Sequence, residues 1–523
     1  MRVPLTPIRC LYRAVDLYGS KEAIICGEKR FTYSQFGERC EKFASALRMA
    51  GVEPDDRVAF LSFNTHRLLE GYYAAPLAHA MVMPLNVRLT EPELANILRH
   101  AEAKMLFFEN DFAPIVANLL QAWPGMRTVN LDTEYEDFLA AGKAERADIY
   151  SYDEDKIAEL FYTSGSTGTP KGVMLGHRTV YMHAMSVAGV FNSDDAGVEL
   201  HTIPLFHANG WGRPQTATMM GLKQVMVRRF DPPAVCRLIQ TEGATAMSLV
   251  PTMANALLNL PNLSEYDFSS LKNIMIGGAA ASAHLIERME TVFGCDVFAG
   301  YGLTETCPVA TSARRKSTVV YTDDADRYRH QSMAGWTIPG TTVRVVDEQM
   351  NDVPRDRAAI GEVVIAGDNV MDGYFREPAA TAAVMSGPWF HSGDMAVWDK
   401  DGYIHIVDRK KDIIISGGEN ISSIEVENML ATHPAVLEAA VVGAPDPNWG
   451  EIPVAFIVVR PGVECSAKDL MDFSMQRLAK FKLPRVFEFM DEPLPKGGTG
   501  KILKRELREK FWQGKDRRVQ GIG

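Results

Sequence analysis

Features of a secreted or membrane-spanning protein are missing from this sequence. No uninterrupted apolar run approaches the ~18 residues that cross a bilayer, and the N-terminal MRVPLTPIRCLYRAVDLYG lacks the continuous apolar stretch of a signal peptide. The seven cysteines form no Cys-x-x-Cys pair, so the sequence indicates neither a disulfide framework nor a zinc site. We therefore expect a cytoplasmic protein with reduced cysteines and no transmembrane segment.

Positively charged residues are fewer than negatively charged ones. The chain has 55 Lys and Arg against 66 Asp and Glu, a net charge of -11, which argues against a general nucleic-acid or anionic-membrane surface. Basic residues gather in the C-terminal stretch from Lys496 to Arg518. That stretch fits a solvated helix face or a phosphate contact, and composition favours the solvated face.

The features that are present indicate a large α/β protein with more than one domain. At 523 residues, 46% of them hydrophobic, the chain exceeds the size of a single core. Helix and strand patterns alternate up to about residue 340, which predicts layered α/β subdomains, and short strands between 340 and 408 predict a β-rich subdomain. We expect residues 1–408 to form a large N-terminal domain and residues 409–523 a small α+β domain.

One loop has the composition of a phosphate-binding site. Residues 162–172, YTSGSTGTPKG, combine glycines, hydroxyl side chains and Lys171, which supply close backbone approach, hydrogen-bond donors and positive charge. The loop is not a Walker A motif, because Pro170 precedes the lysine and Gly172 follows it. This departure excludes the P-loop kinases and ATPases.

A hairpin is predicted between residues 391 and 412, where two alternating strands flank Asp401-Gly402. Asp394 lies seven residues before Asp401, and Arg409 lies seven residues after Gly402. We therefore expect the two side chains to sit opposite each other at the open end of the hairpin. They can act on one ligand or form a structural ion pair.

Taken in order, these motifs resemble the adenylate-forming superfamily of acyl-CoA synthetases, luciferases and peptide-synthetase adenylation domains. The string TSGSTG followed by PKG resembles its phosphate loop, YGLTET at 301–306 its second signature, and PKGGTGKILKREL at 495–507 its C-terminal lysine loop. The resemblance spans nearly the whole chain. It implies that the enzyme makes an acyl-adenylate from ATP and a carboxylic acid and then passes the acyl group to coenzyme A.

The resemblance also implies roles for individual residues. Lys501 becomes the catalytic cation of adenylation, Thr304 an α-phosphate contact and Tyr301 an adenine contact, while Glu305 and Thr163 become ligands of Mg2+. The ATP contacts that it implies are Thr163, Ser164, Gly165, Ser166, Thr167, Lys171, Gly278, Ala279, Ala299, Gly300, Tyr301, Thr304, Asp394, Arg409 and Lys501.

The acid is expected to bind beside PLFHANGWG at 204–212. By resemblance His207 lies next to the reacting carboxylate, and Gly277 and Gly302 line the acyl group. Relatives that activate amino acids carry an Asp in this segment, and this chain has none, which disfavours an amino-acid substrate. Trp211 resembles a residue that gates the acyl tunnel of long-chain enzymes, although a core aromatic is an equally good reading.

The coenzyme A site and the domain hinge follow from the same resemblance. The segment ISGGENISSIEVE at 415–427 resembles the lining of the thiol tunnel, with Gly417, Gly418, Glu419 and Asn420, and Lys480 is expected to meet CoA phosphates. Lys411 falls at the hinge about which the small domain rotates. Some relatives carry other residues in place of Ile415 and Asn420, so these contacts stay open.

We therefore predict an AMP-forming acyl-CoA ligase acting on a medium- or long-chain fatty acid, with ATP, Mg2+ and coenzyme A. Aryl acids and short thioether or branched acids are the alternatives within the same mechanism. A luciferase-like oxygenase and a nucleotide-binding protein without catalysis are the alternatives of other classes. No nucleic-acid partner is expected, and a homodimer is compatible with the sequence.

Overall fold

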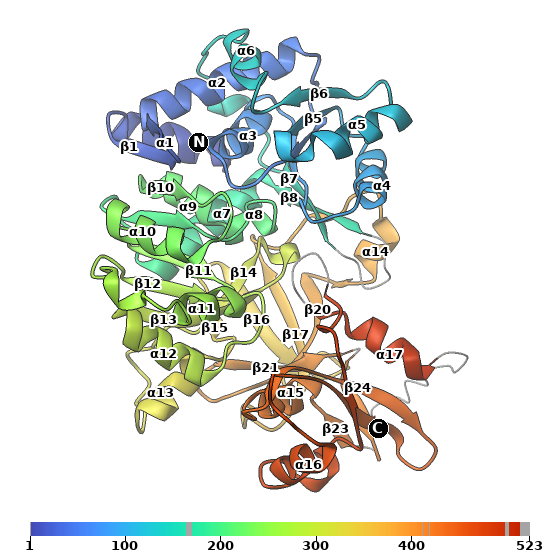
Figure 1. Ribbon diagram of the computed structural model, residues 1–523. Helices are drawn as coiled ribbons and strands as arrows, with labels where there is room; N and C mark the ends of the chain where they lie inside the picture. The colour runs from blue at the N-terminus through green and yellow to red at the C-terminus, as the bar shows by residue number, and fades with distance from the viewer. Residues whose placement is uncertain (1, 164–169, 411, 418, 497–501, 513–523) are drawn as a thin grey trace. The chain divides into compact units, whose positions relative to one another are not determined.

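The computed structural model describes residues 2–163, 170–410, 412–417, 419–496 and 502–512 (Figure 1). The chain divides into two compact units, one made of Met1–Val343 and Val364–His391, the other of Arg344–Val363 and Ser392–Gly523. None of the helices in the described part of the chain combines the length and apolar character that a bilayer crossing requires. All seven cysteines are free.

The first unit contains two large sheets. One has the strand order β18 (Gly373–Tyr374), β8 (Lys171–Gly176), β7 (Ile157–Thr163), β4 (Met81–Pro84), β3 (Arg57–Leu61), β5 (Met105–Phe108) and β6 (Arg127–Asn130). The other has the order β15 (Trp336–Thr337), β14 (Val309–Ser312), β13 (Asp296–Gly302), β12 (Asn273–Ile276), β11 (Ala246–Leu249), β9 (Val198–His201), β10 (Lys223–Met226), β1 (Glu22–Cys26) and β2 (Lys29–Thr32).

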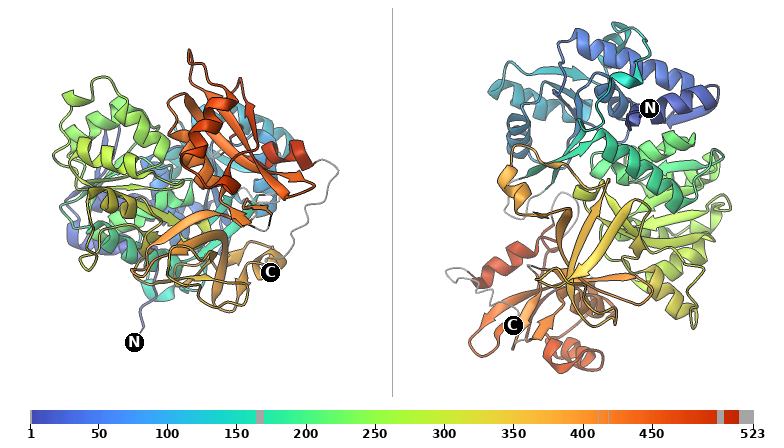
Figure 2. Two further views of the ribbon diagram at one scale, coloured as in Figure 1. Left: turned by 90° about the horizontal axis from the view of Figure 1, so that it is seen from below. Right: turned by 180° about the vertical axis from the view of Figure 1, so that it is seen from behind.

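Helices cover these sheets and fill the space between them. Helix α7 packs against β7 and β8, while α9 packs against α7, β9 and β10, as the two views of Figure 2 and the labels of Figure 1 help to follow. The helices of this unit are α1 (Pro7–Tyr18), α2 (Tyr33–Met49), α3 (His66–Leu77), α4 (Glu91–Ala101), α5 (Ala113–Ala122), α6 (Tyr135–Ala140), α7 (His177–Phe191), α8 (Ala208–Trp211), α9 (Arg213–Met220), α10 (Pro232–Glu242), α11 (Pro251–Leu258), α12 (Ala283–Phe293), α13 (Asp324–Gln331) and α14 (Pro378–Ala382).

The local sequence accounts for these elements. Strands β3 and β4 are runs of buried apolar residues, as expected for parallel strands covered on both faces. Helix α2 begins at a capping box, in which the Thr32 hydroxyl accepts from the Gln35 amide at 3.3 Å and the Gln35 side chain accepts from the Thr32 amide at 2.8 Å. The α/β class predicted from the sequence is confirmed.

Smaller sheets complete the fold. The third has the order β16 (Thr341–Val346), β17 (Gly361–Gly367), β20 (Trp389–Trp398) and β19 (Met385–Ser386), with β21 (Ile404–Arg409) beside β20. The fourth, in the second unit, has the order β23 (Glu419–Ile421), β22 (Ile414–Ser416), β25 (Gly450–Val459) and β24 (Val436–Asp446), with β26 (Val486–Phe489) beside β25. Helices α15 (Ser423–Ala431), α16 (Ala467–Met475) and α17 (Lys504–Trp512) also belong to the second unit.

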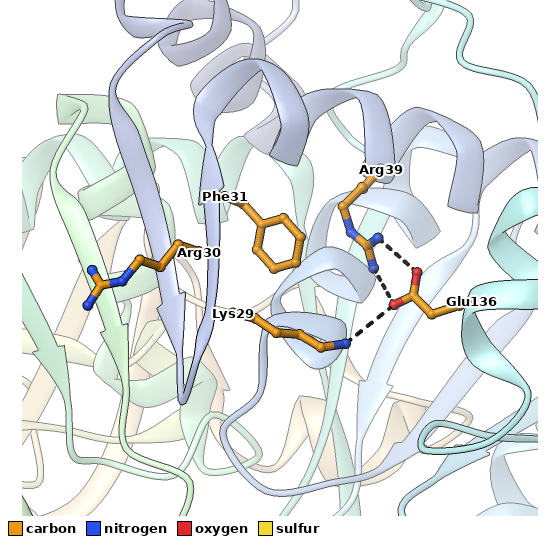
Figure 3. A pocket seen from close by; sticks show the side chains of 5 residues that line it. All are labelled: Lys29, Arg30, Phe31, Arg39 and Glu136. Atoms are coloured by element: carbon orange, nitrogen blue, oxygen red, sulfur yellow. Dashed lines mark hydrogen bonds and ion pairs between the residues drawn. The ribbon is translucent and has the colours of Figure 1, made fainter.

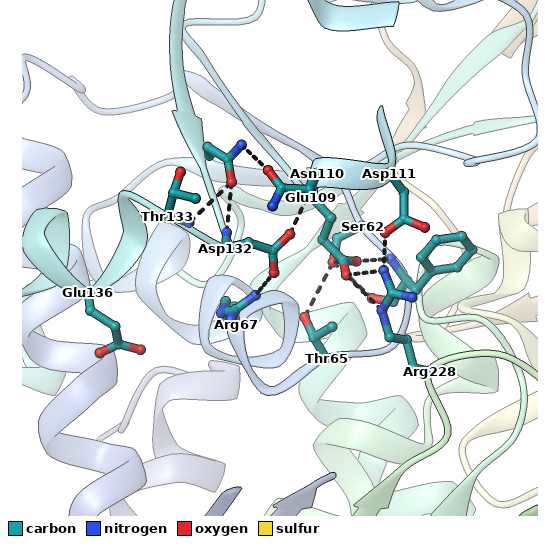
Figure 4. Close-up of polar contacts among 12 residues, drawn as sticks. Ser62, Thr65, Arg67, Glu109, Asn110, Asp111, Asp132, Thr133, Glu136 and Arg228 are labelled. Atoms are coloured by element: carbon teal, nitrogen blue, oxygen red, sulfur yellow. Dashed lines mark hydrogen bonds and ion pairs between the residues drawn. The ribbon is translucent and has the colours of Figure 1, made fainter. Parts of the chain in front are cut away.

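A buried carboxylate links the two large sheets of the first unit. Glu109, which follows β5, accepts from the Ser62 hydroxyl at 2.8 Å, the Phe63 amide at 2.6 Å and the guanidinium of Arg228 at 2.9 Å (Figure 4). Arg228 follows β10 of the other sheet. Glu109 is almost fully buried and is the acceptor of the Phe63 amide. The Ser62 hydroxyl also contacts the Phe63 carbonyl oxygen, and Arg228 also pairs with Asp111.

Replacing Glu109 by alanine is expected to destabilise this link. The change leaves the Phe63 amide without its acceptor, while Ser62 and Arg228 keep their other partners. An unsatisfied buried donor costs about 1–3 kcal/mol. Urea denaturation followed by tryptophan fluorescence would measure the free energy of unfolding. The matched control is Glu28→Ala at an exposed turn, for which we expect a change within about 0.5 kcal/mol; equal effects of the two substitutions would contradict the assignment.

Candidate functional site

The two ends of the predicted phosphate loop are held by an antiparallel ladder. Strands β7 and β8 pair along their length, with Thr163 directly opposite Lys171. Ser164, Gly165, Ser166 and Thr167 lie outside the described residues. The ladder fixes where the loop leaves the sheet and where it returns.

Two further elements meet the end of this ladder. The ammonium of Lys171 lies over the ring of Tyr374 at 4.8 Å from its centroid. The Tyr374 hydroxyl donates to the carboxylate of Glu305 at 2.9 Å, and burial together with that carboxylate raises the pKa of Tyr374, so the hydroxyl stays a donor. The phosphate loop and the YGLTET motif, far apart in sequence, therefore meet through one tyrosine.

Glu305 has the chemistry of a magnesium ligand. Its carboxylate and the hydroxyl of Thr163 are both partly exposed oxygen donors, and oxygen is the donor that Mg2+ prefers. Among the described residues, no group of three or more His, Cys, Asp or Glu side chains is arranged so that it could hold a metal ion. A magnesium ion commonly uses one or two carboxylates and completes its shell with phosphate oxygens and water, so these residues fit an ion brought with a nucleotide.

Small residues from two neighbouring strands meet at one sheet edge. Strands β12 and β13 run parallel, with Ile276 opposite Ala299, so the segment Gly277–Ala279 lies beside Gly300–Gly302. A side chain on Gly277 would lie 3.1 Å from the Gly300 carbonyl oxygen. A side chain on Gly302 would overlap the carbonyl oxygen of Pro308. The protein's own packing therefore leaves no room for a side chain at Gly277 or Gly302, and Tyr301 lies in the same segment.

The predicted acid segment forms a turn of left-handed backbone. Residues 208–212 have φ between 38° and 74°, and L-residues other than glycine rarely adopt such angles. His207 precedes this turn and is partly buried. Trp211 is 6% exposed, and its indole lies against Gly277 and Gly278, 3.1 and 3.3 Å from where a β-carbon would be. The turn therefore brings the acid segment to the small-residue edge.

Sequence reasoning missed one residue of this region. Glu159 in β7 is fully buried. Its carboxylate accepts from the side-chain amide of Asn209 at 2.9 Å and from the side-chain amide of Gln215 at 2.6 Å. Burial raises the pKa of Glu159 to about 8, and the two amides act in the opposite direction. The available signal was a single acid inside the otherwise apolar strand IAELFYT.

The second unit pairs the two charged residues of the predicted hairpin. Asp394 of β20 stands directly opposite Arg409 of β21, and the guanidinium lies 3.5 Å from the carboxylate. Asp394 is buried and Arg409 is exposed, so the carboxylate is held in place while the guanidinium faces solvent. The arrangement fits a ribose contact or a structural ion pair.

The structure describes some of the residues predicted for the coenzyme A site, the hinge and the lysine loop. The Trp449 ring covers Gly417, which has a φ of 61°. In the hairpin of β22 and β23, Glu419 pairs with Ser416 and Asn420 pairs with Ile415. Lys480 begins a short 3-10 helix. Gly418, Lys411 and Lys501 lie outside the described residues. Lys496 and Ile502, on either side of residues 497–501, form an isolated bridge.

A network that the sequence did not predict follows the lysine loop. Lys504, the first residue of α17, contacts Glu427 at 2.7 Å and the Ser423 hydroxyl at 2.6 Å. Asp408 accepts from the Ser423 amide at 2.6 Å, and burial raises the pKa values of Asp408 and Glu427. The start of α17 is thereby tied to β21 and α15.

A surface pocket of the first unit lies apart from all of these motifs. It is lined by Lys29, Arg30, Phe31, Arg39 and Glu136 (Figure 3). Glu136 pairs with Arg39 at 2.9 Å and with Lys29 at 3.8 Å, and Arg30 pairs with glutamates outside the pocket. Its charges are compensated within the protein, so the pocket offers no free charge to a ligand.

Comparison with known proteins finds relatives of the whole chain. Residues 11–375 match the model of the AMP-binding enzyme family, and residues 425–501 match that of the AMP-binding enzyme C-terminal domain. The chain is 38% identical to a long-chain-fatty-acid–CoA ligase of Thermus thermophilus over 96% of this chain and 94% of that one. It is 36% identical to a peroxisomal butyrate–CoA ligase of Arabidopsis thaliana, covering 97% and 93%. The structure of ATP-bound MatB from Rhodopseudomonas palustris matches with a TM-score of 0.86 at 28% identity, covering 97% and 99%.

The raised pKa of Glu159 predicts a pH-dependent effect on stability. From its ordinary pKa of 4.5 up to about 8, the folded protein keeps a proton that the unfolded chain has released, so the free energy of unfolding falls as pH rises through this window. We expect the thermal midpoint of Glu159→Gln, relative to that of the wild type, to rise from about pH 5 to about pH 8 and then to level off. Calorimetry across this range would measure it, with Glu28→Gln as the exposed control; a difference that does not change with pH would refute the buried, proton-holding carboxyl.

Proposed function

The chain belongs to the AMP-binding enzyme family as an ATP-dependent, AMP-forming acyl-CoA ligase, and we propose that its acid is a medium- or long-chain fatty acid. The observation that carries the nucleotide part is the meeting of Lys171, Tyr374 and Glu305 at the end of the β7–β8 ladder. This arrangement supports a site in which Lys171 of the predicted phosphate loop and Glu305 of the YGLTET motif face the phosphates of ATP.

In the proposed first half-reaction, a carboxylate oxygen of the acid attacks the α-phosphorus of ATP, and pyrophosphate leaves. Thr163, Lys171 and the loop hydroxyls would hold the phosphates, and Glu305 with Thr163 would hold Mg2+. A bound magnesium ion would supply charge neutralisation at the phosphate oxygens. Lys501 would neutralise the charge that develops between the carboxylate and the α-phosphate, a contribution that is commonly large. Asp394 and Arg409 would contact the ribose.

In the proposed second half-reaction, the thiolate of coenzyme A attacks the carbonyl carbon of the adenylate, and AMP leaves with the bonding electrons. We propose that the small domain, residues 409–523, rotates about Lys411 relative to residues 1–408. This rotation would withdraw Lys501 and present Gly417, Gly418, Glu419 and Asn420 to the pantetheine arm, with Lys480 near the CoA phosphates. Splitting the reaction in this way converts a poor electrophile into a reactive one.

The fatty-acid assignment has two supports. The acid segment contains no carboxylate that could hold a substrate amine, and the Thermus thermophilus relative is a long-chain-fatty-acid–CoA ligase. One observation favours a second candidate, a short or branched acid. Trp211 is buried in an apolar cluster with Met275 and Phe298, so its indole can form the end of a shallow pocket. A cytoplasmic location and a homodimer remain predictions.

An acid panel would distinguish the two candidates. We expect CoA-dependent AMP release with even-numbered saturated acids from octanoate to stearate, and little with acetate, benzoate or cinnamate. Trp211→Ala should leave the chain-length profile centred on the same acids if the indole gates a tunnel. If the indole closes a shallow pocket, the wild type will prefer butyrate and the variant will shift to longer chains, and the fatty-acid proposal then fails.

Replacing Lys501 by alanine tests the rotating-domain account. Loss of a preorganised charge in a dry site costs about 10²–10³ in rate, so ATP–pyrophosphate exchange should fall by about that factor. Transfer of the acyl group from supplied acyl-adenylate to coenzyme A should change little, because Lys501 would be withdrawn at that step. Lys400→Ala, on the exposed hairpin of the second unit, serves as the control. Equal losses in both half-reactions would refute the rotation.

A further inference from the structure

We propose that Glu159 is a positioning residue that anchors the acid-binding turn, residues 207–212, to the strand that leads into the ATP loop. This inference rests on the proposed function, because it takes His207 and Trp211 as neighbours of the acid. Glu159 itself is not placed against substrate, and it would act through the backbone of the turn.

The Glu159 carboxylate bridges the turn and helix α9, which follows it. Its Oε2 accepts from Asn209 Nδ2 at 2.9 Å, and Asn209 lies inside the turn. Its Oε1 accepts from Gln215 Nε2 at 2.6 Å, and Gln215 lies in α9, which follows the turn. Glu159 stands in β7, the strand that ends at Thr163. One side chain therefore connects the strand that leads into the predicted phosphate loop to the middle of the turn and to the helix that follows it.

The turn needs such an anchor because its backbone is strained. All five residues from Ala208 to Gly212 have positive φ, and three of them are not glycine. Residues held in this region persist where the surroundings over-determine them, and they cluster at functional sites. Hydrogen bonds to a buried acceptor, which has no competing water, supply that constraint.

A second buried carboxylate holds the other side of the segment. Arg213, at the start of α9, donates to Glu199 of β9, and its guanidinium stacks on Phe191 at 3.7 Å from the ring centroid. Glu199 belongs to the second large sheet, whereas Glu159 belongs to the first. The acid segment is thus fastened to both sheets, and the anchor on the nucleotide side is Glu159.

Two ionisable groups from other parts of the chain, Tyr72 and Cys307, are influenced by Glu159. Tyr72 of α3 and Cys307, which follows the YGLTET motif, both have pKa values raised by burial first and by the charge of Glu159 second. The side-chain oxygens of Asn209 and Gln215 are buried and have no partner. A neutral amide or carboxyl at position 159 can therefore accept from one amide and donate to the oxygen of the other, whereas an apolar side chain leaves both amides unpaired.

Kinetics of two substitutions would test the anchor. Glu159→Leu removes both acceptors, so we expect the KM for the acid to rise at least about tenfold, equivalent to ~1.4 kcal/mol, with the KM for ATP changed less than about twofold because the β7–β8 ladder still holds the loop ends. Glu159→Gln should restore the acid KM to near the wild-type value. Glu109→Gln changes a buried carboxylate whose partners Ser62, Phe63 and Arg228 lie outside residues 207–215. It should lower stability without changing the ratio of the two KM values.

The acid used is whichever panel member the wild type adenylates best, so failure of the fatty-acid assignment does not affect this test. If Glu159→Leu does not fold, Asn209→Ala replaces it, since it removes the partner within the turn and should raise the acid KM selectively. Equal changes in both KM values, an unchanged acid KM in the folded variant, or no rescue by glutamine would each overturn the proposal.

Discussion

The pairing of β7 with β8 is the constraint on which the rest of the site depends. A phosphate loop works only if its backbone returns to a fixed place, and this ladder sets Thr163 opposite Lys171. On the far side of β8, β18 adds Tyr374 opposite Val173. That single strand pairing brings an aromatic ring to the lysine and a hydroxyl to Glu305. The order of strands in one sheet thus assembles groups from three distant parts of the sequence.

Local chemistry explains what could be predicted from the sequence. The strand at 273–276, the helix at 283–293 and the strand at 296–302 follow from apolar periodicity and from Gly294 just beyond the helix. The opposition of Asp394 and Arg409 is predicted from a two-residue turn at Asp401-Gly402. The strands nearest the turn instead pair Trp398 with Ile404, one residue out of that register, and the irregularity between Met395 and Ala396 restores the predicted opposition. In each case the information lies within about twenty residues of sequence.

The parts that could not be predicted depend on partners far apart in the chain. Glu159 is separated from Gln215 by 56 positions, and Lys504 from Ser423 by 81, so no local pattern connects them. The sequence likewise does not predict the left-handed backbone of residues 208–212, because Ala208 and Trp211 have no intrinsic preference for it. Tertiary contacts impose this conformation against local propensity, and such conflicts are expected at functional sites.

The same reasoning explains why the acid is harder to identify than the nucleotide. The residues predicted to hold the phosphates, a lysine and several hydroxyl side chains, stand together in the string at 162–172, so their proposed role can be predicted from local sequence. The wall of the proposed acid site combines a strained turn, the ends of β12 and β13, and an indole buried against two glycines. Under the proposed function, the depth of this site would depend on where Trp211 is held, and the proposed anchors of the turn are buried carboxylates in two different sheets. Specificity for the acid would therefore depend on the packing between the sheets, whereas nucleotide binding would depend on the loops.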